Sequence, residues 1–498
     1  MNDRSELLAS SLWLVALLVM AVSLSFSGIN HVSLHAETSP AAAVPGGAPK
    51  ATGYFHAHKE ADGRWWIIAP DGSRFISKGV CNVTYWQDKI QGTDHSPYLE
   101  ANKAKYGSID AFRKAAGARL LGWNFNSLGA WADSAISAVE VNGLRLARSP
   151  ILDLGSSFVA EKNKAHPERG HAWLHGTFPD VFDADFEPFM RREAMEKCAP
   201  HAKDPYVLGW FTDNELRWGP DWRKNQELLV DFLNAPADTA GRKAAAAFLE
   251  KRYTSIEEFN SIWKTSLKAW PELATAAELK TPYPVKAVYQ QNKDTEEKLN
   301  AAESGRIRYV ADCNAFTAIL AEKYFKGTTE AIRAAAPHHM VFGCRFAYVP
   351  IQPVVDAASH TLDVISFNAY AHDPTGTINR YAVFGKPLII GEFAFRAEDS
   401  GLPNTKGAGP KVKNQAERAA AYRVYVQKAM EHPQMVGYHW FEHADEPKEG
   451  RFDGENSNYG VVNIKDEPYE EFVKVAREVN AQAEAWHGGQ KAALPADK

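Results

Sequence analysis

The chain has 498 residues, of which 45% are hydrophobic and 11% aromatic. These values indicate a globular protein with a large core, built as one large domain with insertions or as two domains. The formal net charge is −5 and no basic block occurs, which argues against nucleic acid or an anionic membrane surface as a partner. Core packing accounts for most of the 14 Trp and 18 Tyr residues, with a mild preference for a carbohydrate-binding cleft.

The first 36 residues are predicted to be a secretory signal peptide. Residues 12–26 are apolar except for two serines, and this run is short for a bilayer span of ~20 residues. Residues 33–36 (Ser-Leu-His-Ala) provide a small-x-Ala cleavage site. We therefore expect a secreted or periplasmic protein with no stable membrane partner; an uncleaved N-terminal anchor is the alternative. Residues 37–52 are rich in Pro, Ala and Gly and are predicted to be a disordered linker.

Residues 53–486 are predicted to form a (β/α)8 barrel, an α/β fold, followed by a disordered tail at 487–498. Two strand-like runs around a Pro-Asp-Gly turn predict an N-terminal β-hairpin over residues 64–75. Eight apolar, strand-like segments come next, each with a helical or long-loop segment after it, which is the number that this barrel requires. The predicted strands are residues 75–80, 123–128, 147–154, 206–211, 340–345, 362–370, 387–391 and 435–441.

Helical patterns occupy the intervals between several predicted strands. The clearest are residues 109–121, 311–335, 414–431 and 468–483. The longest interval, residues 220–300, is also mostly helical, and Ser255 followed three residues later by Glu258 is a helix start. We interpret it as a helical insertion after the fourth strand, which either walls a cleft or serves as scaffold.

Two predicted buried strands each run into a glutamate. Residues 207–211 lead to Asp213, Asn214 and Glu215, and residues 388–391 lead to Glu392. Barrel enzymes build their sites at the carboxyl ends of the strands. Retaining glycosidases place two carboxyl groups roughly 5–5.5 Å apart, one to protonate the leaving oxygen and one to attack the anomeric carbon. For either strand alone, a simple polar turn is the alternative.

Other predicted strands also end in polar or aromatic residues. Amides, carboxylates, an arginine and aromatic rings together suit a ligand rich in hydroxyl groups, although each residue alone is more often an ordinary loop residue. The predicted substrate contacts are Asn214, Asn126, Trp131, Arg345, Asn368, Tyr370, Trp440, Glu442 and Asp445.

Neither a metal nor a cofactor is predicted. The string His439-x-x-Glu442-His443 matches a zinc motif that belongs on a helix, but here it follows a strand. The chain has no Gly-rich phosphate loop and no dinucleotide fingerprint. Its four cysteines have no zinc spacing and no compact disulfide framework, so whether one disulfide forms stays open. They are Cys81, Cys198, Cys313 and Cys344.

These motifs resemble glycoside hydrolase clan A, the barrel clan of retaining glycosidases in which an Asn-Glu pair ends strand four and a second Glu ends strand seven. The resemblance implies that Glu215 is the acid/base, that Asn214 binds the sugar 2-hydroxyl and that Glu392 is the nucleophile. It also implies that Tyr370 contacts the nucleophile and that Trp440 is the strand-eight tryptophan, which would stack on a sugar face.

Within the clan, the chain is most similar to the β-agarases of family 50, over about residues 53–484. The motifs that carry this similarity are residues 209–219, 390–393, 437–447, 450–451, 454–456, 459–461 and 468–469. Glutamine is expected where Glu442 stands, and those agarases commonly carry a further N-terminal carbohydrate-binding domain; both differences leave the substrate open.

The resemblance implies retaining hydrolysis of a β-linked, galactose-containing polysaccharide or oligosaccharide by two glutamates. The alternatives are a clan A enzyme of other specificity (a β-galactosidase, β-glucanase or β-mannanase), a transglycosylase, or a non-catalytic carbohydrate-binding barrel. Exo or endo action and the oligomeric state are not predicted.

Overall fold

The structure is a computed structural model that describes residues 50–276, 278–283 and 304–490. The predicted signal peptide, nearly all of the predicted linker and part of the predicted insertion lie outside the described residues. The account below concerns the unit Ala43–Lys498. Within the described ranges, no helix combines the length and apolar character needed to cross a membrane.

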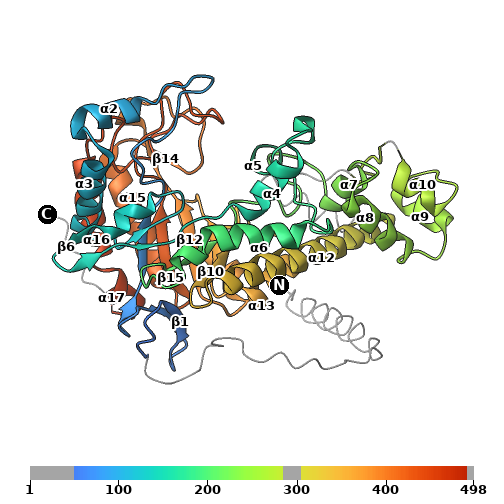
Figure 1. The fold of residues 1–498 in the computed structure, drawn as a ribbon, viewed down its shortest axis with the longest axis horizontal. Coiled ribbons are helices and arrows are strands. Elements are labelled where there is room, and N and C mark those ends of the chain that lie inside the picture. Colours follow the sequence, from blue (N-terminus) through green and yellow to red (C-terminus); the bar gives the residue numbers. More distant parts are fainter. Residues whose placement is uncertain (1–49, 277, 284–303, 491–498) are drawn as a thin grey trace, which may run out of the picture. The chain divides into compact units, whose positions relative to one another are not determined.

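Parallel strands form the centre of this unit (Figure 1). Six of them pair side by side in the order β11-β12-β15-β4-β5-β8, and β9 pairs with β10. Single bridges, Arg148 to Val207 and Phe346 to Phe367, join the two groups at both ends, so the pairings run round a closed ring. The strands are β4 (Ser77–Val80), β5 (Ser127–Leu128), β8 (Ala147–Arg148), β9 (Gly209–Phe211), β10 (Met340–Gly343), β11 (Ile365–Asn368), β12 (Leu388–Phe393) and β15 (Met435–Trp440). The predicted α/β fold with a parallel sheet is confirmed.

Helices alternate with these strands and pack against their outer side. Helices α6, α12 and α13 lie side by side, and α15 packs against β15, α16 and α17 (Figure 1). Side chains of Ser108 and Asn414 accept backbone N–H bonds and so begin α3 and α15, close to the predicted starts. The helices are α2 (Pro97–Tyr106), α3 (Ile109–Gly122), α4 (Leu154–Lys162), α5 (Ala172–His175), α6 (Phe186–Lys197), α12 (Ser304–Ala335), α13 (Gln352–Thr361), α14 (Thr375–Ala382), α15 (Gln415–Met430), α16 (Glu470–Asn480) and α17 (Ala483–His487).

A small antiparallel sheet precedes the barrel. The predicted hairpin is present as β2 (Trp65–Ile68) and β3 (Arg74–Phe75), with β1 (His56–Lys59) added at its edge. His487 is buried against this sheet, where its Nε2 lies 2.8 Å from the carbonyl oxygen of Trp65. The predicted disordered tail, 487–498, therefore starts too early, because an imidazole at this position fills a packed contact.

The interval after β9 is helical, as predicted. Its described helices are α7 (Leu228–Leu233), α8 (Ala240–Glu250), α9 (Ile256–Trp263) and α10 (Trp270–Thr275). The Ser255 side chain caps α9, and Thr254 donates to Glu258 at 2.7 Å, which confirms the predicted helix start. Helices α8, α9 and α10 gather at the end of α12 that is remote from the barrel strands (Figure 1).

Asp466 anchors the loop before α16 to α2 and α3. This fully buried carboxylate accepts hydrogen bonds from Tyr98 (2.7 Å), from Lys105 (3.0 Å) and from both terminal nitrogens of Arg119 (2.8 and 2.9 Å). Although burial opposes the charge, these donors and the nearby His443 hold the pKa of Asp466 well below its usual range. The contact fixes the strand-eight loop against the first two helices.

We predict that Asp466→Asn destabilises the fold by about 3 kcal/mol, because it leaves the largely buried Arg119 without its counter-charge. Since the folded pKa is lowered, the contribution is complete above the unfolded pKa of about 3.9 and is lost as the pH falls below it. Urea unfolding across the pH range checks this. The exposed Asp110→Asn, which removes a surface pair with Arg113, should change stability by less than about 0.5 kcal/mol. Equal losses in both variants would contradict the prediction.

Candidate active site

Backbone conformations that are unusual for residues with side chains cluster at the carboxyl ends of the barrel strands. The loops after β4, β5, β8, β9 and β10 each contain a non-glycine residue at a φ between 48° and 59°. Such a conformation costs on the order of 1–3 kcal/mol per residue and is typical of functional sites. These residues are Asn82, Trp131, Asp153, Glu215 and Arg345. Three of them are site residues predicted from the sequence: Trp131, Glu215 and Arg345.

Glu215 lies after β9, largely buried but with 9% of its surface exposed. Its backbone N–H donates to the carbonyl of Cys344 at 3.0 Å, which ties it to the end of β10. Asn368, the last residue of β11, donates from Nδ2 to Glu215 Oε1 at 2.7 Å and approaches Asn214 Oδ1 at 3.4 Å. The predicted residues Asn214, Glu215 and Asn368 therefore form one contact group.

Glu392 lies in β12, and its two carboxylate oxygens face two different donors. Arg345 donates from Nη2 to Oε1, and Tyr370 donates to Oε2 at 2.6 Å. Gly391 makes this approach possible, because a Cβ there would stand 3.0 Å from Arg345 Nε and 3.0 Å from Asn368 Oδ1. The predicted residues Arg345, Tyr370 and Glu392 form a second contact group, beside the first.

The charge of Glu215 affects the pKa of Glu392. Burial raises the pKa of Glu392 to about 7, the charge of Arg345 opposes this, and the negative charge of Glu215 adds to it. Donation from the Tyr370 hydroxyl also lowers the pKa of Glu392. The cation and the hydroxyl thus favour the ionised form of Glu392 against burial.

Aromatic rings hold Arg345 in place. Its guanidinium carbon lies 4.6 Å from the ring centroid of Trp131 and 5.2 Å from that of Phe211. Trp131 therefore reaches the site through Arg345, as a neighbour of the predicted nucleophile. Asp153 lies near the same group, and burial raises its pKa while Arg345 and Trp131 oppose the rise.

Two predicted substrate contacts lie away from the glutamates. Asn126 precedes β5 and bonds to the backbone of Lys78 (2.8 Å) and Ile76 (2.9 Å), so it joins strands at their amino ends. Trp440 is fully buried on the outer side of β15, 4.8 Å from the Phe472 ring of α16, and its indole N–H donates to Tyr459 at 2.8 Å. Both predictions are wrong: Asn126 stands at the opposite barrel end, and Trp440 has no face for a sugar.

The two acids predicted after strand eight are also bound internally. Glu442 is fully buried and accepts from Asn82 Nδ2 at 2.5 Å, and burial raises its pKa well above its usual range. Asp445 accepts from Asn458 (2.8 Å), from the Gly460 N–H (2.9 Å) and from Tyr469. Both acids thus organise the loop after β15 through these internal contacts, and their predicted contact with a substrate stays a prediction.

The metal-like string at 439–443 does not converge. His439 points into the barrel, where its Nε2 lies 2.8 Å from Ser77 Oγ, whereas Glu442 faces Asn82 and His443 faces Asp466. Among the described residues, no group of three or more His, Cys, Asp or Glu side chains is arranged to hold a metal ion.

Arg451, in the loop after β15, lies in an ion-pair cluster near the site, and no role was predicted for it from the sequence. Its guanidinium lies 3.1 Å from Glu446, 2.9 Å from Asp453 and 2.8 Å from Glu455. The charge of Arg451 lowers the pKa of Glu392, and the charge of Glu215 adds to the effect of burial in raising the pKa of Glu455. Arg451 and its three carboxylate partners therefore adjoin the two glutamates. The Gly-Arg motif at 450–451 was the available signal.

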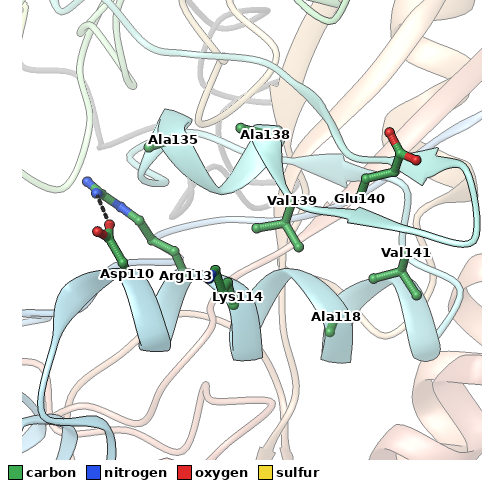
Figure 2. Close-up of a pocket in the computed structure, with 9 residues that line it drawn as sticks. All are labelled: Asp110, Arg113, Lys114, Ala118, Ala135, Ala138, Val139, Glu140 and Val141. Atoms are coloured by element: carbon green, nitrogen blue, oxygen red, sulfur yellow. Dashed lines mark hydrogen bonds and ion pairs between the residues drawn. The ribbon is translucent and has the colours of Figure 1, made fainter.

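Two surface hollows lie apart from the glutamates. One, with a volume of about 620 Å³, lies between α3 and the segment 135–141; Figure 2 shows its lining, with Asp110 and Arg113 paired at one end. The other, of about 380 Å³, lies between α4 and the α7 region. Neither contains Glu215 or Glu392, so the candidate site is defined by its side-chain contacts.

Comparison with curated proteins finds agarases. The chain is 26% identical to β-agarase B of Vibrio sp. (strain JT0107) over 501 residues, which is 86% of this chain and 48% of the relative. It is 28% identical to β-agarase A of the same strain over 492 residues, covering 86% and 45%. The chain thus spans about half the length of these relatives. No family model matches the chain.

Comparison with solved structures finds proteins of similar fold, agarases among them. PfGH50B and a protein described as an exo-β-agarase each match with a TM-score of 0.69 and 24% identity, over 89% of this chain and 67% of theirs. The agarase AgWH50C matches with a TM-score of 0.67 and 25% identity, over 89% and 66%. Together with the motifs at the strand ends, the curated matches confirm the resemblance: the chain is similar to the β-agarases, with the fold of solved family 50 structures.

Proposed function

We propose that this protein is a retaining glycoside hydrolase that cleaves β-linked, galactose-containing polysaccharide or oligosaccharide, with Glu215 as acid/base and Glu392 as nucleophile. One observation carries the proposal: two glutamates at the ends of the fourth and seventh barrel strands have opposite sets of partners. Glu392 accepts from a cation and a hydroxyl, and Glu215 accepts from the neutral amide of Asn368.

In the first step, an oxygen of Glu392 forms a bond to the anomeric carbon as the glycosidic bond breaks. The leaving oxygen takes a proton from Glu215, which becomes ionised. Arg345 and Tyr370 favour the ionised form of Glu392 against burial and orient it before the attack, and their donation weakens as its charge passes into the ester bond.

In the second step, ionised Glu215 takes a proton from water, and the water oxygen bonds to the anomeric carbon from the side that the leaving group vacated. The ester bond to Glu392 breaks and returns the electron pair to its carboxylate, so the product keeps the original configuration. Asn368 links both halves of the site, since it bonds to Glu215 and pairs with Glu392 across β11 and β12.

The galactan part of the proposal is supported by the relatives, which are named β-agarases. The chain covers about half of their length, so the substrate has to be established on this protein. Secretion through the predicted signal peptide is part of the same proposal, because a polysaccharide of this kind is met outside the cell.

A panel of substrates tests the function directly. We expect the full chain to cleave agarose oligosaccharides or another β-galactoside, and Glu392→Gln to lose on the order of 10⁴-fold or more in kcat, because the amide is a poor nucleophile. Reducing-end release and thermal melting give the readout. Glu398→Gln, an exposed change just past β12, is the matched control and should keep full activity.

Cleavage only of β-glucan or β-mannan would keep the mechanism and reject the galactan. Near-normal activity of Glu392→Gln would reject the nucleophile. If no substrate in the panel, which includes porphyran, were cleaved but one were bound, a non-catalytic carbohydrate-binding barrel would replace the enzyme.

The role of Glu215 predicts a dependence on the leaving group. Glu215→Ala removes proton donation, so it should cut hydrolysis of the natural glycan by more than about 10²-fold while affecting formation of the glycosyl-enzyme from an activated aryl glycoside far less. The burst of released phenol, followed by slow turnover, measures this. A uniform loss on both substrates would contradict an acid/base role for Glu215.

The pH profile tests the contacts of Glu392. Because the pKa of Glu392 is raised to about 7 and its ionised form is the nucleophile, kcat/KM should fall on the acid side with a midpoint at about 7. Tyr370→Phe removes a donor that lowers this pKa, so the midpoint should move to higher pH. Tyr422→Phe, which removes a buried hydroxyl bonded to Asn480, should leave it in place. A midpoint that stays or falls in Tyr370→Phe would refute the assignment.

A further inference from the structure

Exposed aromatic rings gather on the loops that follow the barrel strands. Among the described residues, three Trp or Phe side chains are strongly exposed: Trp86 (49%), Trp222 (43%) and Phe452 (57%). They lie in the loops after β4, β9 and β15, on the same side of the barrel as the two glutamates. Single exposed apolar side chains are common, but contiguous groups of them mark binding surfaces.

Two of these exposed rings, Phe452 and Trp222, are linked to a further aromatic ring, that of Trp173. Trp173, in α5 between β8 and β9, lies with its ring centroid 5.9 Å from that of Phe452, and the rings are tilted by 59°. Arg223 donates to the Trp173 carbonyl at 3.2 Å, and its guanidinium carbon lies 4.4 Å from the Trp222 ring centroid. Trp173, Trp222 and Phe452 thus come from three different loops and form one connected group, called here the aromatic rim.

The aromatic rim connects to the candidate nucleophile. Arg451, the residue before Phe452, lies 5.5 Å from the ring centroid of Phe441. Phe441 in turn lies 6.4 Å from the ring of Tyr370, which bonds to Glu392. The rim therefore continues outward from the strand-seven side of the site.

The rim also connects to the acid/base candidate. Arg217, two residues after Glu215, donates to the carbonyl of Gly176 at 2.9 Å, and Gly176 ends the short helix that carries Trp173. A chain held between the two glutamates would thus meet the rim as it leaves the site.

We propose that the aromatic rim binds sugar units of the galactan chain beyond those that flank the cleaved bond, by stacking on their apolar C–H faces. The inference rests on the proposed function and extends it: the site takes an extended chain. An aromatic face offers a flat apolar surface with a polar edge, which matches a pyranose ring whose hydroxyls project around its rim. The chain that fits is neutral and not anionic. Arg451, the cation next to Phe452, is already paired with three carboxylates and so offers no free charge to an anionic ligand.

Binding measured at two ligand lengths tests the inference. In the full-length Glu392→Gln background, calorimetry with an agarose tetrasaccharide and an agarose octasaccharide should show that Phe452→Ala weakens octasaccharide binding by about tenfold and leaves tetrasaccharide binding unchanged. Phe452→Tyr keeps the ring and should restore the affinity. Leu144→Ala, which changes a 62% exposed side chain of the short strand β7 (Leu144–Arg145), is the control and should have no effect.

Each outcome of these binding measurements either supports or overturns the inference. Equal weakening at both lengths, or a lowered melting temperature with loss at both lengths, would show that the ring contact only holds the loops together and would overturn the inference. Unchanged octasaccharide binding in Phe452→Ala would also overturn it while leaving the proposed function intact. If neither ligand bound and the wild-type protein cleaved no galactan, the proposed function would fail, and this inference with it.

Discussion

The candidate site depends on one buried ion pair, between Arg345 and Glu392. Arg345 is fully buried between the rings of Trp131 and Phe211, where a guanidinium without a counter-charge would be strongly unfavourable. Glu392 provides that charge, and the pair fixes the ends of β10 and β12 relative to each other. The carboxylate is thus held by the same contact that makes the buried arginine tolerable, so its position is set before any substrate binds.

The backbone conformations at the surrounding strand ends cost free energy, which the packing of the barrel core offsets. Five side-chain-bearing residues adopt left-handed backbone conformations there, including Glu215 and Arg345 themselves. Gly391 contributes by having no Cβ, since any side chain would meet Arg345 and Asn368. These features have one consequence in common: side chains that would ordinarily point apart are aimed at a shared point. The closed ring of strands provides the rigid frame that this requires.

The sequence predicts that Glu215 and Glu392 stand at the ends of strands, as they do, but it predicts side-chain directions poorly, for a physical reason. An apolar strand that stops in polar residues marks a strand end, so Glu215 and Glu392 could be found without knowing any register. Trp440 could not be placed, because successive side chains of a strand alternate in direction. In β15, His439 points inward and Trp440 points to the helices. The prediction for Asn126 was wrong for a related reason. The predicted strand had six residues, 123–128, which placed Asn126 near its carboxyl end, whereas β5 has only two residues and Asn126 precedes them.

The loop after strand eight shows why polar residues near a site need not touch the substrate. Asp445 binds the segment that returns to α16, and Glu446 accepts from Ser457 at 2.6 Å and pairs with Arg451. Such carboxylates cost free energy when buried and are compensated only by fixed donors, so they give the loop one conformation. That conformation sets where Phe452 stands. The acids at the strand end therefore act through the loop they fold, and in the proposed site for an extended chain they position Phe452 one layer outward from the two glutamates.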